Sequence, residues 1–254
     1  MKRLSILFFF VVTTLFGQNS SYQSGEWFKF RVHYGFVTAG YATLSVQDSR
    51  MNGRDVYHVK GFGETVGLSK IFFKVRDDYQ SYIDKKTQLP HRSIRDIYEG
   101  GYTKDVVVDY NHGTGKAIVK DKKRGETSVV NFEKNAQDMI SAFYYLRNHV
   151  DPKTIKENDV VEINMFFDNE DYKFQLRFLG REVLKTRFGN VPALVFRPYV
   201  QSGRVFREKE SLTVWISDDE NKIPLLVQAE LAVGSLKATL TEYKGLKHQF
   251  KILY

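Results

Sequence analysis

Two carboxylate clusters, Asp77-Asp78 and Asp218-Asp219-Glu220, are the residues whose type and spacing could do acid–base chemistry. Neighbouring residues of a β-strand point to opposite faces, so Asp77 and Asp78 cannot share a proton or a metal if 75–83 forms a strand. The second cluster precedes Lys222-Ile223-Pro224 and is typical of a turn. A glycosidase can pair carboxylates that lie far apart in the chain, so a hydrolase with dispersed carboxylates stays an alternative.

Other catalytic or metal-binding patterns are missing from the sequence. None of the six histidines lies in an HExxH or HxH arrangement, and the chain has no cysteine. It also has no Gly-x-Ser-x-Gly elbow, and the glycines of 61–67 lack dinucleotide-binding spacing. We therefore expect no metal, no cofactor, no disulfide and no enzymatic activity.

One apolar segment remains as a candidate binding element. Leu68, Ile71, Phe72 and Phe73 follow glycines, and the first three would lie on one side of a short helix. Flexible loop ends often carry lids, so these four residues are predicted ligand contacts in a lid over a cavity. The alternative is ordinary packing of the same side chains against the sheet.

The N-terminus indicates export. Lys2 and Arg3 are followed by a mostly apolar stretch from Leu4 to Phe16 and then by small polar residues. This is the layout of a secretory signal peptide; as an uncleaved anchor the stretch would be short of the ~20 residues that span a bilayer. We predict a signal peptide over 1–18 and a single β-rich domain over 19–254.

The composition limits the cellular location and the binding partners that the protein can have. The absence of cysteine removes the acylation site of bacterial lipoproteins, and an exported chain without disulfides fits the periplasm of a Gram-negative bacterium. A net charge of +8 and a pI near 9.4 permit peripheral contact with anionic membrane surfaces or glycans. The basic residues are dispersed, and nucleic acid is not an expected partner of an exported protein.

Most of the chain alternates with the period of a β-strand. In 28–36, Phe28, Phe30, Val32, Tyr34 and Phe36 share one face, and a turn is expected at Thr38-Ala39-Gly40. In 172–178, aromatic and aliphatic residues alternate with Lys173, Gln175 and Arg177. Asn52-Gly53 is a strong hairpin signal, and roughly a dozen strands with short turns predict a large antiparallel sheet.

One helix is predicted, over Gln137–His149. Met139, Ala142, Phe143 and Leu146 are three and four residues apart and would form its apolar face. Such a stripe has to be buried, so the predicted fold is mainly β: a large antiparallel curved sheet or open barrel packed on one central helix, plus a short helical lid segment. Phe143 and Leu146 are expected to be buried.

An ordered set of motifs resembles an exported bacterial family, domain of unknown function 3108. The motifs are Ala39-Gly40-Tyr41-Ala42-Thr43-Leu44, the segment 74–84, Glu99-Gly100-Gly101-Tyr102, the helix with 141–147, and Val214-Trp215-Ile216-Ser217-Asp218-Asp219. The resemblance covers most of 25–243 and implies no activity and no catalytic residues. The curved sheet is loosely similar to periplasmic lipoprotein carriers, an analogy of fold alone.

We therefore expect a periplasmic or envelope-associated binding or carrier protein. Its ligand would be apolar or amphipathic, such as a lipid or a lipid-linked glycan, because the aromatic content is high and no catalytic grouping is visible. Two alternatives remain: a protein-interaction module of envelope assembly, and the hydrolase described above. An exposed apolar patch would favour the first and facing carboxylates the second.

Overall fold

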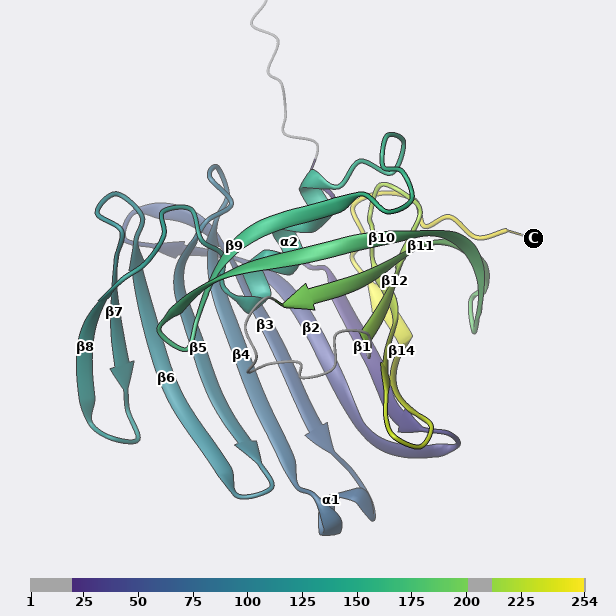
Figure 1. The fold of residues 1–254 in the computed structure, drawn as a ribbon, viewed down its shortest axis with the longest axis horizontal. Helices are drawn as coiled ribbons and strands as arrows, with labels where there is room; N and C mark the ends of the chain where they lie inside the picture. The colour runs from purple at the N-terminus through teal and green to yellow at the C-terminus, as the bar shows by residue number, and fades with distance from the viewer. Residues whose placement is uncertain (1–19, 201–211, 254) are drawn as a thin grey trace, which may run out of the picture.

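The protein forms one antiparallel sheet of 14 strands, as a computed structural model describes for residues 20–200 and 212–253. The strands pair in the order β8-β7-β6-β5-β4-β3-β2-β1-β14-β13-β12-β11-β10-β9 (Figure 1). The predicted signal peptide, 1–18, lies outside the described residues. The sheet is not closed, because β8 and β9 end the pairing order without pairing to each other.

The elements have the following bounds. The strands are β1 Trp27–Tyr34, β2 Val37–Met51, β3 Arg54–Thr65, β4 Val75–Asp84, β5 Pro90–Glu99, β6 Tyr102–Asn111, β7 Lys116–Asp121, β8 Glu126–Asn131, β9 Val160–Phe167, β10 Glu170–Thr186, β11 Gly189–Val200, β12 Leu212–Ser217, β13 Pro224–Glu230 and β14 Ser235–Lys244. The helices in the described ranges are α1 Ser69–Phe72 and α2 Met139–His149. None of the helices in these ranges has the length and hydropathy needed to cross a membrane.

The sheet curls until β9–β12 pass across the face of the opposite strands (Figure 1). Phe166 of β9 packs edge-on against Tyr110 of β6, with ring centroids 6.0 Å apart, and contacts Phe132. Asp168, in the turn after β9, pairs with Arg95 and Lys104. The predicted mainly-β fold with one large curved sheet is confirmed, and the sheet is an open one.

Two turns show how the sequence sets the strand boundaries. Asn52 and Gly53 both have positive φ, 49° and 76°, and make the predicted hairpin between β2 and β3. The turn expected at Thr38-Ala39-Gly40 is wrong, because the chain reverses at Gly35 and Phe36 instead. Gly40 is needed inside β2 for another reason: a Cβ there would lie 2.2 Å from the carbonyl oxygen of Glu64.

Helix α2 begins and ends close to the predicted positions. The Asp138 carboxylate accepts hydrogen bonds from the backbone N–H groups of Ile140 and Ser141, both at 2.8 Å, and the Ser141 hydroxyl accepts from the Asp138 N–H. This reciprocal cap satisfies amides that the first turn leaves unpaired. The C-terminal turn carries Arg147 and His149, which suit the negative end of the helix dipole.

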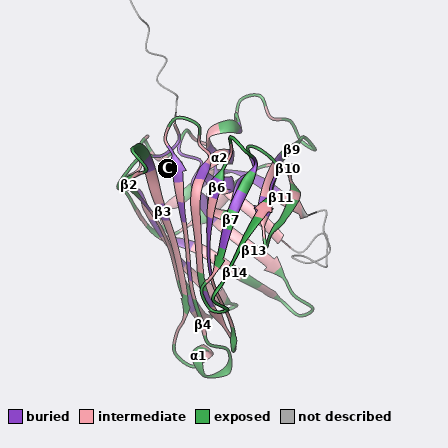
Figure 2. Ribbon diagram, turned by 90° about the vertical axis from the view of Figure 1, so that its left-hand side faces the viewer, coloured by how far each residue is buried: buried purple, intermediate pink, exposed green. Residues whose placement is uncertain are grey.

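α2 is packed on two sides, near one end of the strands. Tyr144 is fully buried against Tyr22, with ring centroids 4.6 Å apart, in a cluster with β2–β4. Ala142 and Leu146 pack on the other side against strands β9–β11. Figure 2 shows buried residues concentrated toward α2 and exposed ones around α1. Leu146 is buried as predicted, whereas Phe143 is only half-buried because its ring borders a cavity.

Candidate functional site

An apolar cavity lies between α2 and the inner face of β9–β12. Its volume is about 310 Å³. Met139, at the start of α2, lines it and is 40% exposed, so the cavity reaches the molecular surface there. The described lining residues are Met139, Ala142, Phe143, Leu146, Arg147, Val150, Met165, Phe167, Tyr172, Phe174, Leu176, Phe196, Pro198, Leu212, Val214 and Ile216.

Two patterns already visible in the sequence supply much of this lining. The four residues of the predicted helical stripe, Met139, Ala142, Phe143 and Leu146, all face the cavity. The alternation in β10 places Tyr172, Phe174 and Leu176 there as well, while Phe178 continues the same face into the buried core. The sequence therefore held the signal for the cavity walls, although it did not show that the helix and these strands face each other.

Arg147 is the only charged residue among the described lining residues, and its charge is neutralised within the fold. Its guanidinium donates two hydrogen bonds to the Glu26 carboxylate, at 2.6 and 2.7 Å, and both side chains are almost fully buried. Its Nε donates to the carbonyl oxygen of Asn221 at 3.0 Å. The guanidinium is thus already hydrogen-bonded to protein acceptors, so a ligand in the cavity would make mainly apolar contacts.

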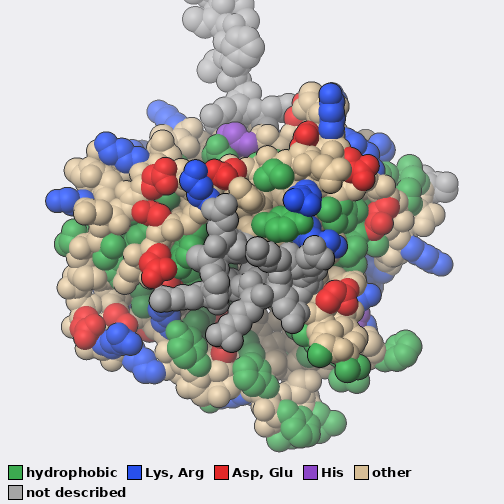
Figure 3. Space-filling view, viewed as in Figure 1, with side chains coloured by type: hydrophobic (Ala, Val, Ile, Leu, Met, Phe, Trp, Pro, Cys, Tyr) green, Lys and Arg blue, Asp and Glu red, His purple; other side chains and the backbone are tan. Residues whose placement is uncertain are grey.

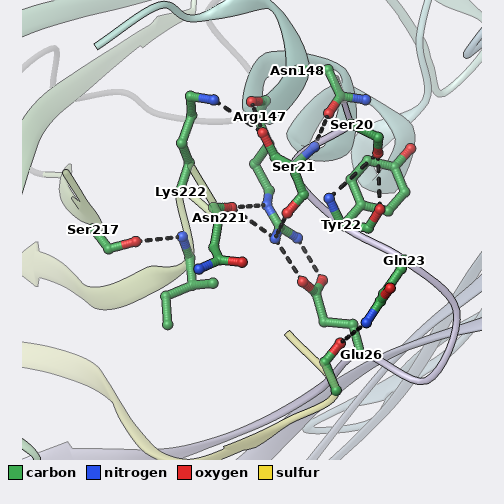
Figure 4. Close-up of polar contacts among 12 residues, drawn as sticks. Ser20, Ser21, Tyr22, Gln23, Glu26, Arg147, Asn148, Ser217, Asn221 and Lys222 are labelled. Atoms are coloured by element: carbon green, nitrogen blue, oxygen red, sulfur yellow. Dashed lines mark hydrogen bonds and ion pairs between the residues drawn. The ribbon is translucent and has the colours of Figure 1, made fainter. Parts of the chain in front are cut away.

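The same arginine joins three distant parts of the chain (Figure 4). Besides Glu26 and Asn221, its guanidinium reaches the carbonyl oxygen of Ser21 at 3.2 Å. Lys222 donates to the Ser21 hydroxyl at 3.0 Å, and burial, followed by repulsion from Arg147, lowers the pKa of Lys222. This buried polar cluster of Ser21, Glu26, Arg147, Asn221 and Lys222 holds α2 against the start of the domain and the turn between β12 and β13.

The four predicted lid residues do not line this cavity. Leu68, Ile71, Phe72 and Phe73 lie in and around α1, in the connection from β3 to β4, at the end of the strands remote from α2 (Figure 1). Their side chains are 56 to 85% exposed, so they are not core residues either. The short helix was predicted correctly, but its position at a sheet end separates it from the cavity. A ligand contact made by these residues stays a prediction.

The carboxylate clusters behave as the sequence indicated. Asp78 pairs with Lys60 at 2.7 Å, whereas Asp77 accepts from the backbone N–H of Tyr98 on β5. Asp219 stabilises its turn by accepting from the backbone N–H groups of Asn221 and Lys222. Burial first, and the neighbouring Glu99 second, raise the pKa of Asp77 to about 6. None of these carboxylates borders the cavity.

No group of three or more His, Asp or Glu residues that could hold a metal ion occurs in the described ranges. The histidines there bond to neighbouring protein groups. His58 bonds to Gln80 at 2.8 Å and His91 to Asp84 at 2.9 Å. These side chains therefore have structural partners in the sheet.

The fold and the cavity define the structural class of this protein: it is an open, curled antiparallel sheet with an apolar cavity between its inner face and helix α2. The family model for a protein of unknown function, DUF3108, matches residues 29–241. The chain therefore belongs to this family, as the motifs of the sequence indicated. Among curated proteins, none matches it.

Two solved structures align with most of this chain. A β-barrel-like protein of domain of unknown function DUF1849 from Brucella abortus is 8% identical, aligns over 88% of this chain and 98% of its own, and gives a TM-score of 0.58. A DUF1089 family protein from Pseudomonas aeruginosa is 10% identical over 84% of this chain and 94% of its own, with a TM-score of 0.37. Only the first TM-score is above 0.5, so only that likeness bears on the fold, and it supports the β-barrel-like architecture.

Proposed function

We propose that this protein is an exported, envelope-associated carrier that binds an apolar or amphipathic ligand, such as a lipid or a lipid-linked glycan. The ligand's apolar part would occupy the cavity between α2 and β9–β12. The observation that carries the proposal is the lining, in which Arg147 alone is charged among the described residues and is already bonded to Glu26. Apolar walls of this kind bind by removing ligand surface from water.

The volume of the cavity supports a ligand of moderate size. At about 310 Å³ it is roughly twice the ~150 Å³ apolar cavity that accepts benzene. It also falls within the ~300–1,000 Å³ typical of small-molecule sites. A space of this size suits part of an acyl chain, and the polar group of the ligand would remain near the exposed side of Met139.

The lining favours binding over hydrolysis. General acid–base cleavage needs a carboxyl or imidazole group within hydrogen-bond reach of the scissile bond. The described cavity walls contain neither Asp, Glu nor His. The interacting carboxyls Asp77 and Glu99 lie near the α1 end of β4 and β5, away from this site.

A filled-cavity variant tests the proposal. Leu176→Trp would place an indole in the cavity, whereas Gln175→Trp would place the same ring on the opposite face of β10, where Gln175 bonds to Glu162. Delipidated wild type should bind a fluorescent fatty-acid probe, Leu176→Trp should bind it at least tenfold more weakly, and Gln175→Trp should match wild type. Urea midpoints of all three proteins separate lost binding from lost folding.

Two results would overturn the cavity as the binding site. One is the absence of probe binding by the delipidated wild type together with no lipid in mass spectra of natively purified protein. The other is equal probe affinity in Leu176→Trp and Gln175→Trp while both remain folded. Export is tested separately, by N-terminal sequencing of protein from the cell envelope, and an intact Met1 there would contradict it.

A further inference from the structure

Most of the strongly exposed hydrophobic side chains in the described part of the chain lie at one end of the sheet. Seven large hydrophobic residues in the described ranges are more than 60% exposed. Six of them lie in or next to the strand connections at the α1 end: Phe36, Val37, Leu68, Ile71, Phe72 and Val233. We call these six residues the hairpin rim. The seventh, Val129, lies in β8.

The rim is built from three connections that strand pairing places at the same end. Tyr34 of β1 pairs with Val37 of β2 and with Leu236 of β14, so the β1–β2 turn lies beside the β13–β14 turn. The β3–β4 connection follows at the end of the next strands, because Gly40 of β2 pairs with Thr65. Figure 1 shows these turns together at the lower end, and Figure 3 shows hydrophobic side chains there.

The rim residues contribute little to folding. Phe36 is 102% exposed and Phe72 is 85% exposed, so their rings stay in water in the folded chain. Leaving a Phe side chain exposed forgoes ~1.5–3 kcal/mol of apolar burial. Exposed hydrophobic residues that gather at one end of the sheet, outside the core, indicate a surface that binds another molecule or a membrane.

A basic cleft lies directly behind one part of the rim. Its lining includes Lys74, Arg76, Lys104, Lys122 and Lys123, and its volume is about 460 Å³. Arg76 pairs with Asp96, Lys104 with Asp168 and Lys122 with Asp105, whereas Lys74 and Lys123 have no carboxylate partner among the described ion pairs. The ring of Phe73, which follows α1, lies against Gly100 in the β5–β6 turn, where a Cβ would clash with it at 2.2 Å. The apolar α1 segment is therefore held next to the strands that carry the cations.

We propose that the hairpin rim docks on an anionic lipid bilayer. The apolar tips would enter the interface between headgroups and acyl chains, and the cations of the cleft would lie at the level of the lipid phosphates. Aromatic and apolar side chains backed by Lys and Arg are typical of proteins that bind at the membrane interface. Each basic residue near an anionic membrane surface adds favourable electrostatic energy.

The shape of the rim favours a bilayer over a protein partner. Its side chains stand on separate turns, and Phe36 is completely exposed without neighbours that shape a pocket around it. A protein interface requires a complementary, closely packed surface. A bilayer adapts to isolated tips, because its interior is fluid and apolar. The rim residues Leu68, Ile71 and Phe72 would then contact lipid as a membrane surface.

Co-flotation with vesicles tests the docking surface. The mature protein should bind vesicles containing phosphatidylglycerol, should bind phosphatidylcholine vesicles more weakly, and should lose affinity as salt rises. The double variant Phe36→Ser/Phe72→Ser should bind at least tenfold more weakly. Val233→Ser should weaken binding, whereas Val183→Ser, a change at a valine that is 58% exposed in β10 away from the rim, should not.

Charge and cavity variants complete the test. Lys122→Ala/Lys123→Ala should reduce binding to the anionic vesicles and leave the weak binding to phosphatidylcholine vesicles unchanged. Docking on the membrane does not require the cavity, so Leu176→Trp should bind vesicles like wild type. The two proposals are therefore independent, and a result against one does not contradict the other.

Three outcomes would overturn the docking proposal. The wild type could fail to float with either vesicle. The Phe36→Ser/Phe72→Ser variant could bind as well as Val183→Ser. The rim could instead mediate self-association in solution, seen as a dimer that the same two substitutions abolish and that does not bind vesicles.

Discussion

The two ends of the sheet use hydrophobic residues in opposite ways. At the α2 end, aromatic and aliphatic side chains are buried in clusters or face the cavity, while the turns carry polar residues such as Asn52-Gly53 and Asp218-Asp219. At the α1 end, the turns carry Phe36 and Phe72 in water. The difference indicates that most of the apolar burial that stabilises the fold lies at the α2 end. The exposed residues at the α1 end contribute little to stability and can contact other molecules.

Breaking the buried ion pair should cause one of the two largest losses of stability at the α2 end. Glu26→Gln leaves the Arg147 guanidinium buried without a counter-charge, and we expect a loss of ~3–5 kcal/mol in unfolding free energy, measured by urea denaturation. The double variant Glu26→Gln/Arg147→Met should be more stable than Glu26→Gln alone. A wild-type midpoint for Glu26→Gln would show that the cluster does not anchor α2.

Phenylalanine truncations compare the two ends directly. Phe178 is 1% exposed and packs on Phe196, so Phe178→Ala should cost ~3–5 kcal/mol. Phe72→Ala should change the unfolding free energy by less than ~0.5 kcal/mol, because its ring is already in water. Phe143→Ala should fall between them, since part of its ring faces the cavity. Equal costs for Phe178 and Phe72 would remove the contrast between the ends.

The Asp138 cap predicts a pH dependence of stability. Burial raises the pKa of this carboxyl to about 6, although bonds from backbone amides and from the Ser81 hydroxyl act in the opposite direction. Because the folded state binds this proton more tightly than the unfolded state does, protonation stabilises the fold. This stabilisation is complete below pH ~4 and is lost as the pH rises to 6 and above. Asp77 acts in the same direction.

Asp138→Asn keeps an oxygen for the cap and removes this titration. Its stability relative to wild type should therefore improve between pH 4.5 and pH 7.5, by on the order of 1–3 kcal/mol. Urea midpoints at the two pH values measure the change, and the exposed Asp151→Asn serves as control. If the stability difference between Asp138→Asn and wild type is the same at both pH values, the pKa of Asp138 is not raised in the folded state.

Within the buried polar cluster, the Ser21 hydroxyl should show a smaller effect than the ion pair. The Ser21 hydroxyl donates to the carbonyl oxygen of Arg147 at 2.7 Å and accepts from Lys222. Ser21→Ala should cost about 1 kcal/mol, whereas Ser24→Ala, at an exposed position, should cost less. Thermal or urea unfolding measures both, and a larger loss at Ser24 would mean that the buried polar cluster does not extend to Ser21.

Local patterns in the sequence predicted most elements of the fold because they depend on neighbouring residues. Period-two alternation identified the strands, Asn52-Gly53 identified a hairpin, and the spacing of Met139, Ala142, Phe143 and Leu146 identified the helix and its apolar face. The alternation in 28–36 was extended too far, since Phe36 lies in a turn. A period of two cannot by itself show where a strand leaves the core.

Tertiary structure alone decided which of these faces meet. The stripe of α2 faces the apolar residues of β10 and β12 because the sheet curls, and the pairing of Glu26 with Arg147 joins positions 121 residues apart. Leu68, Ile71, Phe72 and Phe73 were singled out as apolar residues that follow glycines, but only the strand order places them at the end remote from the cavity. The sequence by itself determined the periodicity of each element and the absence of cysteine chemistry. The cavity and the rim depend on long-range packing, which no local pattern encodes.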